Sequence, residues 1–162
     1  MLRALLCMAV PVLTLLISYD AVLRLRKRLN MTKDLYRTAD KMLAMLKYRS
    51  ADVYEMCDVC FDSVKSFDAA AFKSIHDNFS DEWQKACRQT VCELECDAYS
   101  AFEGIADYLG MYDLESQTKR LEYTCEQLQK SCQRCESELA KKKKLYLCMG
   151  AFAGIIICMI VI

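Results

Sequence analysis

Apolar and small residues recur through the last third of the chain in alternating steps of four and three. This is the seven-residue period of a helix that packs one narrow stripe against its neighbours. Charged and amide side chains fill most of the positions in between, and no Pro follows position 113. The sequence therefore predicts one long helix from Asp113 to Ile162. Its stripe comprises Leu114, Thr118, Leu121, Cys125, Leu128, Cys132, Cys135 and Leu139.

Two largely apolar runs bracket the chain. As helices at about 1.5 Å per residue, roughly Ala4 to Leu23 would be about 30 Å long and Leu145 to Ile162 about 27 Å, which suits a bilayer. No small-x-small cleavage site precedes Asp20, so the first run is expected to be a retained anchor rather than a signal peptide. Asp20 is expected at the interface, paired with Arg24. The sequence thus predicts an N-terminal transmembrane anchor over 1–23 and a C-terminal transmembrane helix over 145–162.

Basic residues mark the inner end of each run. Because such residues stay on the cytoplasmic side during insertion, both flanks place residues 24–144 in the cytoplasm and both termini outside. These expected membrane-interface anchors are Arg24, Arg26, Lys27, Arg28, Lys141, Lys142, Lys143 and Lys144. The lysine run could also bind anionic lipid.

Only four Gly and one Pro occur in the chain, which favours an all-α fold. We expect a small bundle of five to six helices, flanked by the two transmembrane helices. The first helix should end near Tyr48–Ser50, and Asp52 should cap a helix to about Lys65. Further helices are expected over 67–76 after a cap at Ser66, from Ser80, and up to Leu109 before Gly110. The expected core faces are Met31, Leu35, Ala39, Met42 and Leu46, and then Trp83, Cys87, Val91 and Leu94.

The segment Ile105 to Gln117 carries a spaced pattern of Leu109-Gly110, Asp113 and Gln117. Followed by a charged, Leu-rich helix and a short terminal anchor, it resembles the stage III sporulation protein AB family. That family is similar in turn to the helical cytoplasmic domain of the type II secretion inner-membrane platform protein. The likeness extends over nearly the whole chain and is poorest over residues 49–79. Without the resemblance, the four residues fit a helix–helix turn with its cap; with it, they become a possible partner surface.

The resemblance implies a component of the multi-protein channel between mother cell and forespore. Its helical domain would face the mother-cell cytoplasm and dock near the cognate secretion-type ATPase and other channel subunits. Membrane lipid is a further expected partner, and a homo-oligomer is possible.

The sharpest chemical alternative lies in two C-x-x-C pairs, Cys57/Cys60 and Cys132/Cys135, which could supply four thiolates to zinc or form a redox dithiol. The pairs are separated by 71 residues, unlike the short spacers of zinc ribbons. Cys132 and Cys135 also occupy stripe positions, where a reduced thiol acts as a small hydrophobe. We therefore expect no metal, no cofactor and no structural disulfide, and keep a membrane-tethered zinc or dithiol protein as the alternative function.

Gly150 and Gly154 form a G-x-x-x-G motif inside the second apolar run, which allows close packing against the first anchor or another subunit. The formal net charge of zero gives no signal for nucleic acid. The chain has no Gly-rich phosphate loop and no nucleophile–base spacing. We therefore expect a non-enzymatic membrane scaffold.

Overall fold

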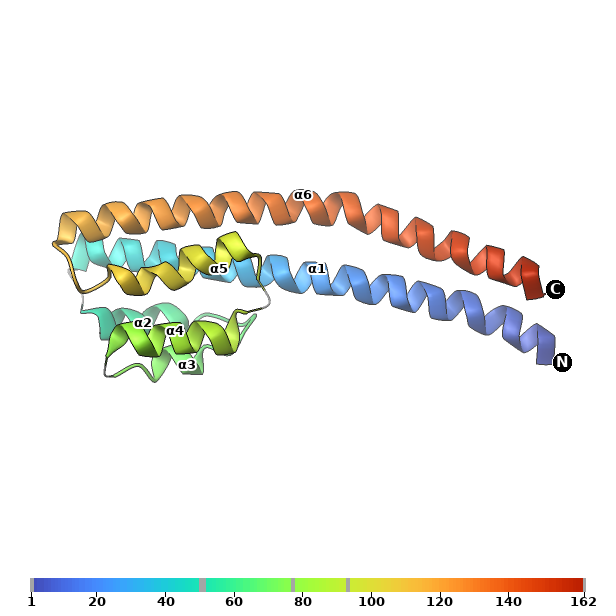
Figure 1. Cartoon of the computed structure of the whole chain (residues 1–162), viewed down its shortest axis with the longest axis horizontal. Helices are drawn as coiled ribbons and strands as arrows, with labels where there is room; N and C mark the ends of the chain where they lie inside the picture. The colour runs from blue at the N-terminus through green and yellow to red at the C-terminus, as the bar shows by residue number, and fades with distance from the viewer. Residues whose placement is uncertain (1, 50–51, 77, 93, 162) are drawn as a thin grey trace. The chain divides into compact units, whose positions relative to one another are not determined.

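The computed structural model describes residues 2–49, 52–76, 78–92 and 94–161. It is all-helical, with no strand in these ranges, which confirms the all-α class (Figure 1). The elements are α1 (Leu2–Arg49), α2 (Val53–Phe61), α3 (Ala70–Lys73), α4 (Phe79–Thr90), α5 (Cys96–Glu103), the 3₁₀-helix η1 (Gly104–Asp107) and α6 (Leu114–Val161).

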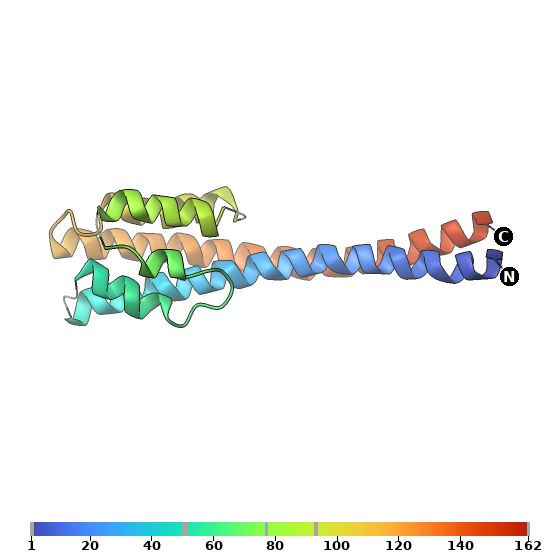
Figure 2. The same ribbon diagram turned by 90° about the horizontal axis from the view of Figure 1, so that it is seen from below.

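The chain divides into two compact units. Unit 1 comprises residues 1–27 and 135–162, and unit 2 comprises residues 28–134. Within unit 2, the end of α1 and the start of α6 lie side by side and antiparallel, and a 2.5 Å ion pair between Lys47 and Glu122 joins them (Figures 1 and 2). Helices α2, α3 and α4 pack in succession beside them. The predicted domain boundaries, at 23/24 and 144/145, remain predictions.

Helix α1 ends at Arg49, where the sequence predicts its end, and all five predicted stripe residues from Met31 to Leu46 are buried. Its apolar side chains meet an aromatic centre in unit 2. Phe61 stacks on Phe72 with ring centroids 4.4 Å apart, and Trp83 lies 5.0 Å from Phe102. The indole Nε1 of Trp83 donates a 3.1 Å hydrogen bond to the carbonyl oxygen of Phe102, so burial leaves this donor paired. The predicted Trp83 core face is confirmed.

The links around α3 differ from the predicted ones. Helix α2 ends at Phe61 rather than Lys65, and α3 has only 4 residues instead of covering 67–76. Ser66 caps no helix, because the carboxylate of Asp34 accepts hydrogen bonds from its backbone N–H at 3.2 Å and its hydroxyl at 2.7 Å. This contact holds the link between α2 and α3 against α1.

Helix α4 begins at Phe79, one residue before the predicted start at Ser80. Asn78 holds its N-cap position with φ 30° and ψ 69°, a left-handed conformation that Asn tolerates better than most residues. The predicted acids Asp81 and Glu82 do lie in its first turn, where the helix dipole favours negative charge. Asp77 and Asn78 precede the helix in a segment whose sequence, Asp-Asn-Phe, predicts a turn; Asp77 lies outside the described residues.

The long final helix α6 confirms the predicted start after Asp113. The middle of its stripe, from Leu121 to Cys135, is buried, whereas Leu114 is 47% exposed and Leu139 only half-buried. The stripe is therefore shorter at both ends than the sequence predicts.

No helix in the described part of the chain is both apolar enough and long enough to span a bilayer. The side chains of many residues in the two apolar runs lie outside that description, so the anchors over 1–23 and 145–162 remain predictions. These residues are 1–11, 15, 147, 151, 154, 155, 157, 158 and 160–162.

Candidate partner surface at the 108–117 turn

The turn between η1 and α6 depends on a residue without a side chain. Gly110 has φ 81°, in the left-handed region, as the predicted C′ position requires. A Cβ atom at this position would also lie 3.2 Å from Cγ2 of Val53 at the start of α2. Both the backbone conformation and the close approach to α2 therefore select Gly at position 110.

The side chain of Gln117 braces this turn from inside. Its Oε1 accepts a 3.3 Å hydrogen bond from the backbone N–H of Gly110, and its Nε2 donates to the carbonyl oxygen of Tyr112. The side chain is buried, so both bonds replace contacts with water. Gly110 and Gln117, two members of the spaced sequence pattern, thus act as one structural element.

Asp113 caps α6 as predicted. Its Oδ2 accepts a 3.0 Å hydrogen bond from the backbone N–H of Ser116, and its carbonyl oxygen accepts one of 3.0 Å from Gln117. Hydrogen bonds from Ser116, first from its side chain and then from its backbone, hold the pKa of the Asp113 carboxyl below its ordinary value. Leu109, the remaining predicted residue, is buried. The sequence pattern therefore encodes a capped, braced helix–helix turn.

The turn presents apolar side chains that the sequence did not single out. Met111 is 69% exposed and Tyr112 49% exposed, and Leu114 follows them on the same exposed stretch. The guanidinium of Arg120 lies 4.7 Å from the centroid of the Tyr112 ring and holds it by a cation–π contact. A rigid backbone that displays exposed apolar side chains is suited to protein contact.

The C-x-x-C pairs lie on α2 and α6. Cys57 and Cys60 are buried in unit 2, and the Cys60 Sγ lies 3.6 Å from the Met45 Sδ. Burial raises the pKa of Cys57 to about 12 and that of Cys60 to about 11. Cys132 and Cys135 are also buried. In the ranges that the structure covers, no three His, Cys, Asp or Glu side chains are grouped so that they could hold a metal ion.

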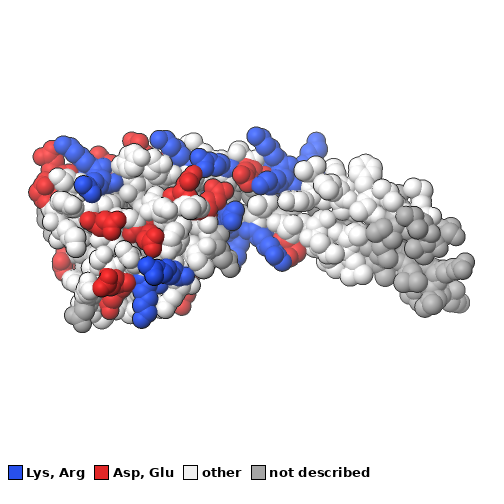
Figure 3. Space-filling model, viewed as in Figure 1, with Lys and Arg blue, Asp and Glu red and all other residues white. Residues whose placement is uncertain are grey.

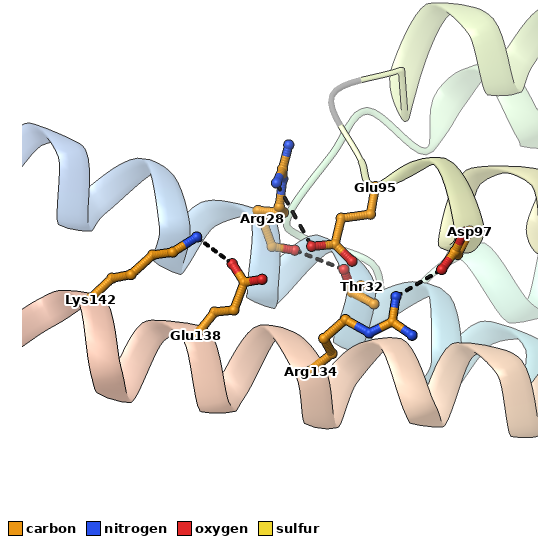
Figure 4. A network of polar contacts seen from close by, with 7 residues as sticks. All are labelled: Arg28, Thr32, Glu95, Asp97, Arg134, Glu138 and Lys142. Atoms are coloured by element: carbon orange, nitrogen blue, oxygen red, sulfur yellow. Dashed lines mark hydrogen bonds and ion pairs between the residues drawn. The ribbon is translucent and has the colours of Figure 1, made fainter.

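The predicted membrane-interface anchors lie on the two long helices, α1 and α6. Arg24 pairs with Asp20 at 2.8 Å, as predicted, and within unit 1 Lys142 pairs with Glu138 at 2.6 Å. Within unit 2, Arg28 approaches Glu95 at 3.9 Å (Figure 4). Other predicted anchors, such as Arg26, Lys141, Lys143 and Lys144, are exposed.

Gly150 lies against the first apolar run inside unit 1. A Cβ atom on it would lie closest to the Ser18 Oγ, and then 2.9 Å from the Ser18 Cβ and 3.3 Å from the Thr14 carbonyl oxygen. The absence of a side chain at Gly150 therefore permits α1 and α6 to approach closely here. Gly154, the second Gly of the motif, lies outside the residues whose side chains are described.

The family model for stage III sporulation protein AB matches residues 3–162, which is nearly the whole chain. No curated protein and no solved structure matches this chain. The match includes the 108–117 turn, both apolar runs and the stretch 49–79, where the sequence resemblance to the family is poorest.

Proposed function

The chain belongs to the stage III sporulation protein AB family, and from this membership we propose that it is a non-enzymatic scaffold of a sporulation channel related to type II secretion. In this proposal both ends cross the cell membrane, and the helical region between them lies in the mother-cell cytoplasm. There it contacts a secretion-type ATPase and other channel subunits. The family match carries the sporulation role.

The membrane part of the proposal is supported by the sequence and by one contact in unit 1. Residues 145–162 contain no charged side chain, and basic residues flank both apolar runs on the inner side. In lipid, where apolar surface gives no drive for association, helices pair through small residues that let their backbones approach. The fit of Gly150 against Ser18 is of this kind.

The scaffold part of the proposal is supported by the 108–117 turn. The Gln117 side chain accepts a hydrogen bond from Gly110 and donates one to Tyr112, and Asp113 accepts one from Ser116. These bonds fix the backbone of the turn, while Met111 and Tyr112 remain exposed. Ordering a loop on binding costs free energy, and a loop that is already ordered avoids that cost. The turn is therefore a suitable contact site for another subunit.

The burial of Cys57 and Cys60 supports a packing role over thiol chemistry. Zinc binding and disulfide exchange both need thiolates, and burial raises the pKa of both thiols. Replacing Cys57, Cys60, Cys132 and Cys135 together with Ala tests this point. A scaffold should lose some thermal stability and still support spore formation, whereas a zinc or dithiol protein should lose its function entirely.

The sidedness of the chain can be tested with Cys92 and Cys96, two exposed thiols that lie outside both apolar runs. An impermeant maleimide should label them in permeabilised cells but not in intact ones, and Cys92→Ser with Cys96→Ser should abolish that signal. Labelling of these two thiols from outside intact cells would contradict the proposal.

The partner assignment needs a separate experiment. Crosslinking in membranes of sporulating cells, with the secretion-type ATPase as bait, should recover this chain. The quadruple Cys variant provides a matched sample in which contact should persist. If the ATPase is present and no such crosslink forms, the contact with it is not part of the function.

A further inference from the structure

An open groove of about 240 Å³ adjoins the 108–117 turn at the end of unit 2. Its walls come from the start of α2, the start of α4 and the 109–111 segment. Val53, Phe79, Ala106, Leu109 and Met111 supply the apolar part of the lining. The volume is below the range of about 300–1,000 Å³ that is usual for small-molecule sites, and it suits one inserted side chain.

Two left-handed backbone positions shape this groove. Asn78, with φ 30°, and Gly110, with φ 81°, both line it. Each is held by a side-chain hydrogen bond: Gln117 accepts one from the Gly110 N–H, and Asn78 Nδ2 donates one of 2.5 Å to Asp81 Oδ2. Gly adopts this conformation readily, whereas at Asn78 it is sparsely populated and persists only where its surroundings fix it, as is common at binding sites. The groove is therefore formed before any partner arrives.

The charge at the groove is acidic. Asp52 lines it, Asp81 is bonded to the lining residue Asn78, and no Lys or Arg is among the described lining residues. Residues 52–82, which supply two of the three walls, carry 8 acidic and 2 basic side chains, a net charge of −6. Within this range Glu55 pairs with Arg49 and Asp62 with Lys73, whereas Asp52 and Asp81 are the acids at the groove. Acidic side chains are prominent at this end on the face in Figure 3, with basic ones among them.

Asp52 does not use its carboxylate as a hydrogen-bonding cap. It occupies the N-cap position of α2, where Asp normally accepts a hydrogen bond from a backbone N–H of the first turn, yet it makes no side-chain cap hydrogen bond. Its exposed carboxylate stands instead at the edge of an apolar groove. An apolar recess beside exposed carboxylates is complementary to an apolar side chain that is flanked by cations.

We propose that this groove binds one apolar side chain, of Leu, Met or Phe size, from a Lys- or Arg-rich segment of another protein in the assembly. The inference rests on the proposed function and deepens it, because it assigns the chemistry of one partner segment. The apolar side chain enters between Val53, Phe79 and Leu109, and the flanking cations pair with Asp52 and Asp81.

Photocrosslinking of the full-length chain in membranes of sporulating cells tests this proposal. Benzoylphenylalanine in place of Met111 should crosslink to a single partner segment that has an excess of Lys and Arg. The same probe in place of Val59, which is exposed on α2 but does not line the groove, should not capture that segment. Mass spectrometry of the crosslinked peptide identifies the segment.

Charge reversal supplies the matched control. Asp52→Lys should lower the crosslink yield at position 111 about tenfold, whereas Asp58→Lys, on exposed α2 surface away from the groove, should leave it unchanged. Circular dichroism should show the same helix content for both variants. Replacing a Lys or Arg of the captured segment with Asp should restore the crosslink to the Asp52→Lys chain.

The proposal is overturned by any of four results. These are no crosslink, a crosslink only to lipid or to a second copy of this chain, capture of a segment without excess positive charge, and a yield that Asp52→Lys does not change. Each of them is compatible with maleimide labelling of Cys92 and Cys96 after permeabilisation only. Failure of the groove proposal is thus distinguishable from failure of the proposed topology.

Discussion

The backbone N–H of Gly110 donates a 3.3 Å hydrogen bond to the Oε1 of Gln117, seven residues further along the chain. Through this bond a residue inside α6 fixes the conformation of the turn that precedes the helix. The spacing of Gly110 and Gln117 in the sequence is therefore a requirement of the turn. Changes at either residue should act on the same element.

Replacing Gly110 with Ala should destabilise unit 2 by about 1–2 kcal/mol, because a Cβ makes the left-handed conformation costly. The 3.2 Å approach to Val53 adds to this cost. Thermal unfolding followed by circular dichroism measures the change. Gly104→Ala is the matched control, since Gly104 has φ −64° and nothing lies within 4 Å of an added Cβ. Equal stability of the two variants would mean that the turn is not left-handed.

Replacing Gln117 with Leu should cost about 1–3 kcal/mol, because it leaves the Gly110 N–H and the Tyr112 carbonyl without their partner in a buried place. Gln129→Leu, at an exposed position of the same helix, should change stability by less than about 0.5 kcal/mol. Chemical denaturation of the two variants gives the comparison. A Gln117→Leu chain as stable as the control would rule out the bracing role.

Replacing Gly150 with Ala should weaken the packing within unit 1 by about 1–3 kcal/mol, since the new Cβ would clash with the Ser18 Oγ and also lie 2.9 Å from the Ser18 Cβ. The Ser18→Gly change should restore much of that loss, because it removes the opposing side chain. Ser18→Ala should restore less, since it keeps the Cβ. Thermal unfolding in detergent compares Gly150→Ala alone with the two double variants that add Ser18→Gly or Ser18→Ala. If Ser18→Gly and Ser18→Ala restore equally, the close approach of the Cβ atoms is not the cause.

Alkaline pH should destabilise unit 2 through its buried thiols. Burial raises the pKa of Cys57 from 9.0 to about 12, and that of Cys60 and Cys125 to about 11. Between pH 9 and 11 the folded chain keeps protons that the unfolded chain releases, so stability is complete below pH 9 and falls as the pH rises. Each thiol contributes up to about 1.4 kcal/mol per pH unit in this window.

Unfolding midpoints at pH 8, 9, 10 and 11 test that slope. Because other groups titrate in the same range, the informative quantity is the difference between the wild type and Cys57→Ala. The variant should lose stability less steeply above pH 9. Parallel slopes would show that Cys57 is not buried as a neutral thiol.

Much of the fold could be predicted because its signals are local. The stripe from Met31 to Leu46 and the Trp83 face follow helical periodicity, and both are buried. Gly110 and Asp113 occupy the terminal positions that their chemistry favours. In each case the residues that decide the structure are neighbours along the chain.

One error arose where a distant residue decides the local structure. Ser66 has the side chain of a helix cap, but Asp34, 32 residues earlier, takes its hydroxyl and its N–H. At the start of α4 the cause is local: Asn78 rather than Ser80 takes the cap position, in a left-handed conformation, and its side chain bonds to Asp81 three residues further on. The predicted caps at Ser66 and Ser80 were therefore wrong, although both residues have hydroxyl side chains that can cap a helix.

The candidate site was predicted only in part for the same reason. The pattern of Leu109, Gly110, Asp113 and Gln117 located the turn, but spacing alone does not show that Gln117 braces it. Val53 and Asn78 reach the groove from other elements. Nothing in the order of residues along the chain brings these positions together, so only the fold could identify them.

Trp83, the single tryptophan of the chain, is completely enclosed, with aromatic rings on several sides and its indole N–H bonded to Phe102. Its fluorescence should consequently be emitted at short wavelength in the native protein and shift to longer wavelength when water reaches the ring. The intrinsic fluorescence of Trp83 therefore reports whether the aromatic centre of unit 2 is packed, without any added dye. Because the two apolar runs contain no second indole, that signal reports on unit 2 alone.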